Sequence, residues 1–95
     1  MQLEELRRKY RELILALADK YQAGNVRIFG SVARGDAKDS SDIDILVRFK
    51  PGASLLDEAG LERELKQLLG PVDMIGDDAI RDEFLPFILN EAVPI

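Results

Sequence analysis

The chain has 95 residues, of which 46% are hydrophobic and 33% charged, and it contains no cysteine and no histidine. This length accommodates one domain, residues 1–95, with a modest core, and no apolar run approaches the roughly 20 residues that span a bilayer. Without cysteine or histidine there are no disulfides, thiolate nucleophiles or zinc–thiolate sites, and the usual general base is missing. Any chemistry must therefore use carboxylates, hydroxyls, lysine and arginine.

Charge is divided unevenly along the chain, whose net charge is −5. Residues 1–50 hold ten Lys and Arg against eight Asp and Glu, whereas residues 51–95 hold three against ten. The acidic C-terminal half disfavours nucleic acid and suits either a basic protein partner or simple solvation, and we expect solvation. The N-terminus lacks the apolar core and cleavage site of a signal peptide, so we expect a cytoplasmic protein that does not associate with membranes.

The first half of the chain predicts one helix and two strands. Apolar residues at steps of three and four predict an amphipathic helix from residue 3 to about Ala23. Its other face carries Arg7, Arg8 and Arg11, which we expect to be solvated rather than a docking patch. A strand follows over residues 26–30 and another over residues 42–49, whose continuous apolar run indicates burial on both faces.

The second half predicts a helix, a strand and further short helices. Ser54 as N-cap and Asp57 three residues later resemble a capping box for a helix that ends at Leu69. A third strand covers residues 72–75, and Asp77 or Asp78 is expected to cap a short helix. Pro86 fits the first turn of a last helix that reaches about Ala92. Its apolar residues are expected in the core; they are Leu85, Phe87, Ile88 and Leu89.

Three aspartates are candidates for one acidic site. Asp42 and Asp44 are two residues apart on a strand, so their side chains leave the same face, where two like charges cost on the order of 1 to 4 kcal/mol. Protonation, an arginine or a divalent cation would each offset that cost, and oxygen-only ligands favour Mg²⁺ or Mn²⁺. Asp73 interrupts an apolar strand and, if that strand lies beside the second, completes a cluster able to hold two metal ions. Otherwise Asp73 is a strand-end residue that faces water.

Gly30 and Ser31 form a second candidate element. A glycine at the end of a strand lets the backbone approach a ligand, and a short helix opening at Ser31 presents N–H groups and a hydroxyl to an anion such as phosphate. An ordinary helix cap is the alternative, and the spacing is not that of a P-loop. Arg34 or Lys38 could add positive charge, unless both are simply solvated. Asp36 and Asp39 are better explained as turn or capping residues.

These motifs together resemble a known family. The segment "GSVARGDAKDSSDID" matches the G-S-x10-D-x-D signature of the minimal nucleotidyltransferases, the small members of the DNA polymerase β superfamily. Most of the chain is similar to this family, including "KPGASLLDEAGLERELKQLLGPVDMI" and "EAVPI". The resemblance implies an α+β fold with a mixed sheet flanked by helices. It also implies Gly30 and Ser31 at a nucleoside triphosphate, Asp42 and Asp44 as ligands of catalytic Mg²⁺, and Asp73 as the carboxylate that helps to activate the acceptor hydroxyl.

The resemblance also implies a partner. Members are typically encoded beside a helical HEPN-domain RNase toxin, and they act as antitoxins by transferring AMP from ATP to a tyrosine of that toxin. A chain of this length has no room for the helical domain with which larger relatives present the acceptor, so a helical partner would supply it. Three alternatives stay open: an antitoxin that neutralises by binding alone, a nucleotidyltransferase acting on a small molecule or an RNA end, and a structural metal-binding domain.

Overall fold

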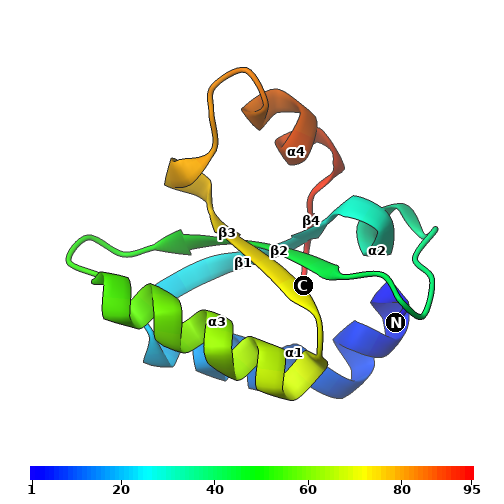
Figure 1. Ribbon diagram of the computed structural model, residues 1–95, viewed down its shortest axis with the longest axis horizontal. Coiled ribbons are helices and arrows are strands. Elements are labelled where there is room, and N and C mark those ends of the chain that lie inside the picture. The colour runs from blue at the N-terminus through cyan, green and yellow to red at the C-terminus, as the bar shows by residue number, and fades with distance from the viewer.

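Four strands form one mixed sheet in the computed structural model, which describes residues 1–95 (Figure 1). The strands are Ala23–Phe29 (β1), Ile43–Phe49 (β2), Val72–Gly76 (β3) and Val93–Pro94 (β4). Their order in the sheet is β3-β2-β1-β4; β1 is antiparallel to β2 and to β4, whereas β2 and β3 are parallel. A parallel pair needs a crossover connection, and a helix provides it here. The predicted α+β fold with a small mixed sheet flanked by helices is confirmed.

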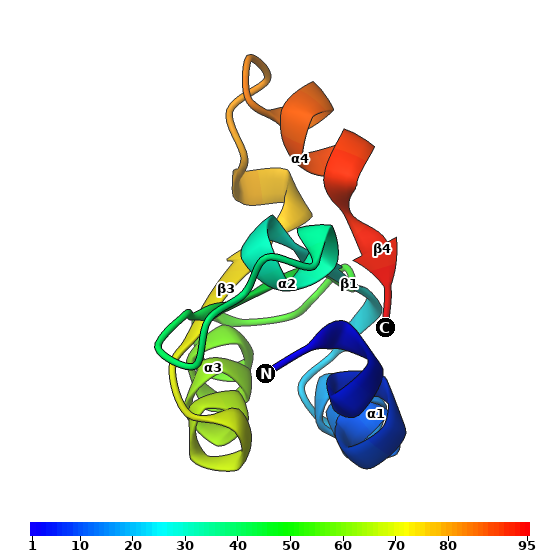
Figure 2. The same cartoon turned by 90° about the vertical axis from the view of Figure 1, so that its right-hand side faces the viewer.

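The helices lie on both sides of this sheet. They are Leu3–Lys20 (α1), Gly30–Arg34 (α2), Leu55–Leu69 (α3), the 3₁₀ helix Asp77–Ala79 (η1) and Leu85–Glu91 (α4). The two long helices, α1 and α3, lie side by side across one face, and α4 lies on the opposite side (Figures 1 and 2). None of the helices has the length and apolar character needed to cross a membrane.

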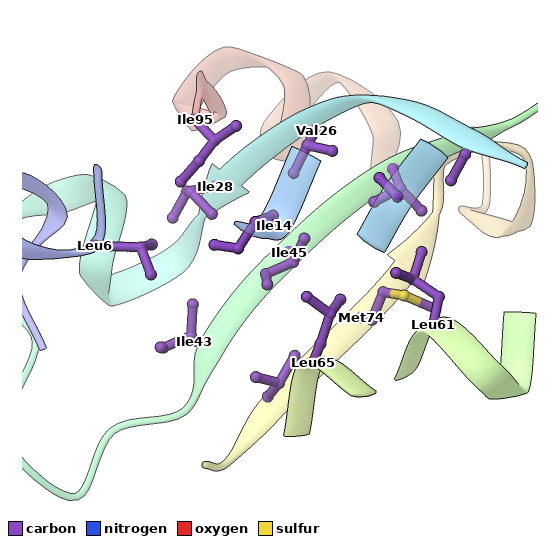
Figure 3. Close-up of a cluster of buried hydrophobic side chains, with 14 of the residues drawn as sticks. Leu6, Ile14, Val26, Ile28, Ile43, Ile45, Leu61, Leu65, Met74 and Ile95 are labelled. Carbon is purple, nitrogen blue, oxygen red and sulfur yellow. The ribbon is translucent and has the colours of Figure 1, made fainter. Parts of the chain in front are cut away.

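The core fills the space between the sheet and the two long helices (Figure 3). Alternate residues of β2 point into it, including Ile43, Ile45 and Val47, while Leu46 is fully buried on the other face. The prediction that β2 is buried on both faces is therefore confirmed. Because strand side chains alternate, this register directs Asp42 and Asp44 to the face that α1 and α3 leave uncovered.

The predicted capping box at the start of α3 is confirmed. The Ser54 hydroxyl accepts a hydrogen bond from the Asp57 N–H (3.2 Å), and the Asp57 carboxylate accepts one from the Ser54 N–H (2.9 Å). This capping box satisfies two donors that the first turn leaves free. The helix then crosses the sheet and ends at Leu69, which brings the chain back to start β3 parallel to β2.

Several details near the C-terminus differ from the predictions. Asp77 does not cap a helix; its carboxylate forms ion pairs with Arg27 (2.9 Å) and Arg48 (3.0 Å). Arg7 is not merely solvated, because its guanidinium donates to the carbonyls of Pro94 and Ile95 and so holds the C-terminal strand against α1. That strand, β4, was not predicted because two residues carry no periodicity.

The placement of the last helix corrects another prediction. Phe87 and Leu89, expected in the core, have 74% and 46% of their surface exposed, and no residue of α4 is buried. Leu85 and Ile88 are only half-buried. The apolar residues of α4 follow a helical period, but the core between the sheet and the two long helices is already closed without them.

Gly60 offers a test of how closely α3 packs on the end of α1. A Cβ atom at Gly60 would lie 2.4 Å from Cε1 of Tyr21, whose hydroxyl is hydrogen-bonded to Glu64. Gly60→Ala should lower the free energy of unfolding by about 1–3 kcal/mol in urea denaturation, although alanine is the better helix former by about 1 kcal/mol. Combining it with Tyr21→Ala should remove the penalty. A stabilised Gly60→Ala single variant would contradict this close packing.

Candidate nucleotidyl transfer site

The predicted site residues meet where β1 and β2 meet α2. Phe29, the last residue of β1, is paired with Asp44 of β2, and Gly30 begins α2 directly after it. Asp42 immediately precedes β2, and Asp73 is the register partner of Asp44 on the parallel strand β3. Neighbouring strands are about 4.8 Å apart, so this register brings two carboxylates side by side on one face.

Gly30 is the position at which this arrangement depends on a glycine. Its φ of +70° is in the left-handed region, and a Cβ atom there would lie 2.0 Å from Oδ2 of Asp44. The Asp44 carboxylate therefore rests directly against the backbone at the start of α2. This contact joins the two halves of the predicted motif, the glycine-serine pair and the aspartate pair, in one place.

The surroundings of Asp44 disfavour the ionised form of its carboxyl group. Partial burial raises the pKa of Asp44, and the negative charges of Asp73, Asp42 and Glu91 raise it further, while Arg34 opposes the shift. Asp42 and Asp73 are both exposed. Asp73 is exposed on the edge strand β3, and the condition for its joining the acidic site is met, because β3 lies beside β2 with Asp73 as the register partner of Asp44.

No group of three carboxylates is placed so that the group by itself could hold a metal ion. The donor set still fits a hard cation, because Mg²⁺ in proteins is commonly held by one or two carboxylates and completes its shell with phosphate oxygens and water. Asp42 and Asp44 supply two carboxylates on one face, and a bound cation would offset the repulsion that raises the pKa of Asp44.

Arg34 lies at the C-terminal end of α2, where it is half exposed. It pairs with Asp36 (3.4 Å) and with Glu91 (3.2 Å). Asp39 lies in a turn, as predicted, which is closed by the Ser41 N–H and the Lys38 carbonyl (2.9 Å), and the Ser41 hydroxyl accepts from the Lys38 N–H (2.9 Å). Asp36 lies outside this turn and pairs with Arg34 instead.

Glu91 is the site residue that the sequence did not reveal. Its carboxylate accepts hydrogen bonds from the Gly30 N–H (2.8 Å) and from Arg34. Glu91 ends α4, about sixty residues away in the sequence, so nothing local signals its position. Lys66 on α3 pairs with Glu62 (2.9 Å), and this hydrogen bond is the main reason that its pKa is raised.

Comparison with known proteins agrees with this geometry. The family model described as the nucleotidyltransferase domain matches residues 10–93. The chain belongs to the nucleotidyltransferase domain family. The protein is accordingly a nucleotidyltransferase, as the motif resemblance implied.

Two relatives and one solved structure are similar to this chain over most of its length. A Methanocaldococcus jannaschii protein, provisionally named a protein adenylyltransferase, is 42% identical over 100% of this chain and 99% of its own length. The protein adenylyltransferase MntA of Thermococcus cleftensis is 37% identical over 81% of this chain and 79% of its own. A solved structure provisionally described as a minimal nucleotidyltransferase superposes with a TM-score of 0.87 at 44% identity, covering 100% of this chain and 97% of that one.

The pKa of Asp44 leads to a prediction about stability. The pKa of Asp44 is higher in the folded protein than in the unfolded chain, so ionising Asp44 lowers the free energy of unfolding. The loss begins near the unfolded pKa of about 3.9 and is complete once the pH is above the raised pKa of the folded state. Asp44→Asn should therefore stabilise the metal-free protein at neutral pH, with a gain that disappears near pH 3. Urea unfolding in EDTA across this range measures it, with Asp39→Asn as the matched control. Lower stability of Asp44→Asn at pH 7 would count against the electrostatic account.

Gly30 and Gly35 form a matched pair for testing the close approach to Asp44. Both have positive φ, but no atom lies within 4 Å of a Cβ placed at Gly35. Gly35→Ala should cost only the backbone strain of about 1–2 kcal/mol, whereas Gly30→Ala should cost more and should also displace the Asp44 carboxylate. Urea unfolding compares the two variants. Equal losses of stability would mean that the contact with Asp44 is easily relieved.

Proposed function

We propose that this nucleotidyltransferase is a Mg²⁺-dependent protein adenylyltransferase. It transfers AMP from ATP to a hydroxyl group of a HEPN-domain RNase partner, and a tyrosine is the acceptor that we propose. By this modification it acts as the antitoxin of that partner. The position of Asp44, between the backbone of Gly30 and the carboxylate of Asp73, carries the proposal. The names of the two relatives, both protein adenylyltransferases, support the kind of group and acceptor.

The triphosphate is assigned to the start of α2. The Gly30 N–H and the Ser31 hydroxyl are the groups there that can donate hydrogen bonds to phosphate oxygens. Arg34 lies on the same short helix and carries a guanidinium suited to phosphate oxygens. This end of β1 is also where Asp44 lies, so the phosphates would be beside the carboxylates that hold the cation.

The proposal assigns Asp42 and Asp44 to Mg²⁺ or Mn²⁺, and it assigns Asp73, the register partner of Asp44, to a second ion whose remaining ligands would be phosphate oxygens and water. When bound, the metal neutralises the triphosphate and lowers the pKa of the acceptor hydroxyl. The chain itself supplies the two-residue spacing that directs Asp42 and Asp44 to one face. It also supplies the parallel register that places Asp73 beside them.

The reaction breaks a phosphoanhydride bond of ATP and forms a phosphoester bond to the acceptor. The acceptor hydroxyl oxygen forms a bond to the α-phosphorus of ATP, the bond from that phosphorus to the bridging oxygen breaks, and pyrophosphate leaves. The hydroxyl proton passes to a carboxylate or to water. Asp73 suits this role because it is exposed on the edge strand β3, where an incoming acceptor can reach it.

An open site favours a macromolecular acceptor over a small molecule. The largest hollow in the surface, about 430 Å³, lies between α1 and α3 and is lined by residues such as Leu13, Leu17 and Leu68. The two smaller hollows also lack Gly30, Asp42, Asp44 and Asp73. Small-molecule substrates are normally held in concave pockets, so a partner protein that covers the acidic face fits this surface better.

Label transfer tests the proposal. The protein is incubated with α-labelled ATP, Mg²⁺ and the product of its neighbouring gene, the proposed HEPN-domain partner. We expect label on the partner, loss of label when a partner tyrosine is changed to phenylalanine, and no label in EDTA. Asp44→Asn should reduce transfer by at least about 100-fold, because losing a ligand should cost no less than losing a residue that supports one. Asp39→Asn, the same change in the loop before β2, should leave transfer unaffected.

Two results would overturn the proposal. If no label is transferred and the partner is inhibited equally well by Asp44→Asn, the protein neutralises by binding alone. If label appears on RNA or on a small molecule while the partner stays unlabelled, the activity is nucleotidyl transfer to a different acceptor.

A further inference from the structure

The carboxylate of Glu91 lies at the position where the proposed function puts a phosphate. One of its oxygens accepts from the Gly30 N–H at 2.8 Å, and the other is 3.2 Å from the Arg34 guanidinium. Gly30 and Arg34 are 61 and 57 residues away in the sequence, so the contact depends on α4 folding back over α2. Both donors at the start and end of α2 are thereby bound to an anion of the chain itself.

This contact uses the interactions that a phosphate group would need. A carboxylate and a phosphate both accept charge-assisted hydrogen bonds from backbone N–H groups and from arginine. The single Gly30 N–H cannot donate fully to both anions at once, and the site already holds the negative charges of Asp42, Asp44 and Asp73. Glu91 therefore opposes nucleotide binding both by occupying the donors and by adding a like charge.

We propose that Glu91 is an internal substitute for a phosphate group, and that a nucleoside triphosphate displaces it and releases α4 from α2. The inference rests on the proposed nucleotide site at Gly30, Ser31 and Arg34. It assigns to α4 a role that changes with nucleotide occupancy: the helix is held against α2 in the free protein and is freed in the complex.

Few buried contacts hold α4, so its release from α2 requires little free energy. The helix has seven residues, none of them buried, and Phe87 has 74% of its surface exposed. After it, the chain is fixed by the two-residue strand β4 and by Arg7, which holds the carbonyls of Pro94 and Ile95. Segments with few buried contacts open at a small fraction of the global unfolding free energy. The helix can thus leave α2 while β4 stays in the sheet.

Nucleotide affinity tests the role of the Glu91 charge. The probe is the α,β-methylene analogue of ATP with Mg²⁺, which binds without being cleaved, measured by calorimetry on the protein alone. Glu91→Gln should bind it about tenfold more tightly than the wild type, because a competing charge is removed; tenfold corresponds to about 1.4 kcal/mol. Glu83→Gln, which removes the same charge just before α4 from a residue paired only with Arg81, should bind like the wild type.

Hydrogen exchange tests the movement without any substitution. On adding the analogue to the wild type, amides of residues 85–91 should exchange faster, whereas those of β1 and β2 should be unchanged or slower. Unchanged or weaker binding by Glu91→Gln, or stronger protection of residues 85–91, would overturn the inference while leaving the nucleotide site intact. If neither the wild type nor any variant binds the analogue, the proposed nucleotide site itself is wrong, and the inference is overturned with it.

Discussion

The close approach of the Asp44 carboxylate to the backbone of Gly30 is the contact on which the site depends. It requires a residue without a Cβ atom at the end of β1 and a carboxylate at the paired position of β2. The antiparallel pairing of these two strands supplies both at once, because Phe29 is the register partner of Asp44 and Gly30 follows directly. The chain thereby places a backbone donor, a hydroxyl and a carboxylate together without any long loop.

The electrostatics of the site follow from the parallel pairing of β2 with β3. That register sets Asp73 beside Asp44, and the strand period sets Asp42 on the same face. A fold selected only for stability would not collect these charges, since each adds to the cost of ionising Asp44. The capping box and the packing of α3 support this arrangement from the other face, because α3 is the crossover that makes β3 parallel to β2.

Sequence reasoning succeeded where a feature is local and periodic. The helix start at Ser54 and the burial of Ile45, Leu46 and Val47 both follow from spacing within a few residues. It failed where an outcome depends on how distant elements meet. Phe87 fits the helical period of a core residue, but the core is already closed without it. The Asp77 carboxylate forms ion pairs with two arginines, one from β1 and one from β2. Glu91 is acidic like many helix residues, and only the folding of α4 over α2 gives it a position in the site.

The face that carries the acidic residues is the one that α1 and α3 leave uncovered, and this explains how such a small chain can serve as an enzyme. The two long helices and one face of the sheet supply the core, so the carboxylates on the other face do not interrupt it. As a result, the acidic face is an open surface. It has no hollow at Asp42, Asp44 or Asp73 that could exclude water or orient an acceptor. Under the proposed function, the partner that covers this surface would also exclude water from the bound nucleotide and so favour transfer over hydrolysis. The small core and the open acidic surface are thus two consequences of using one face of the sheet for folding and the other for the site.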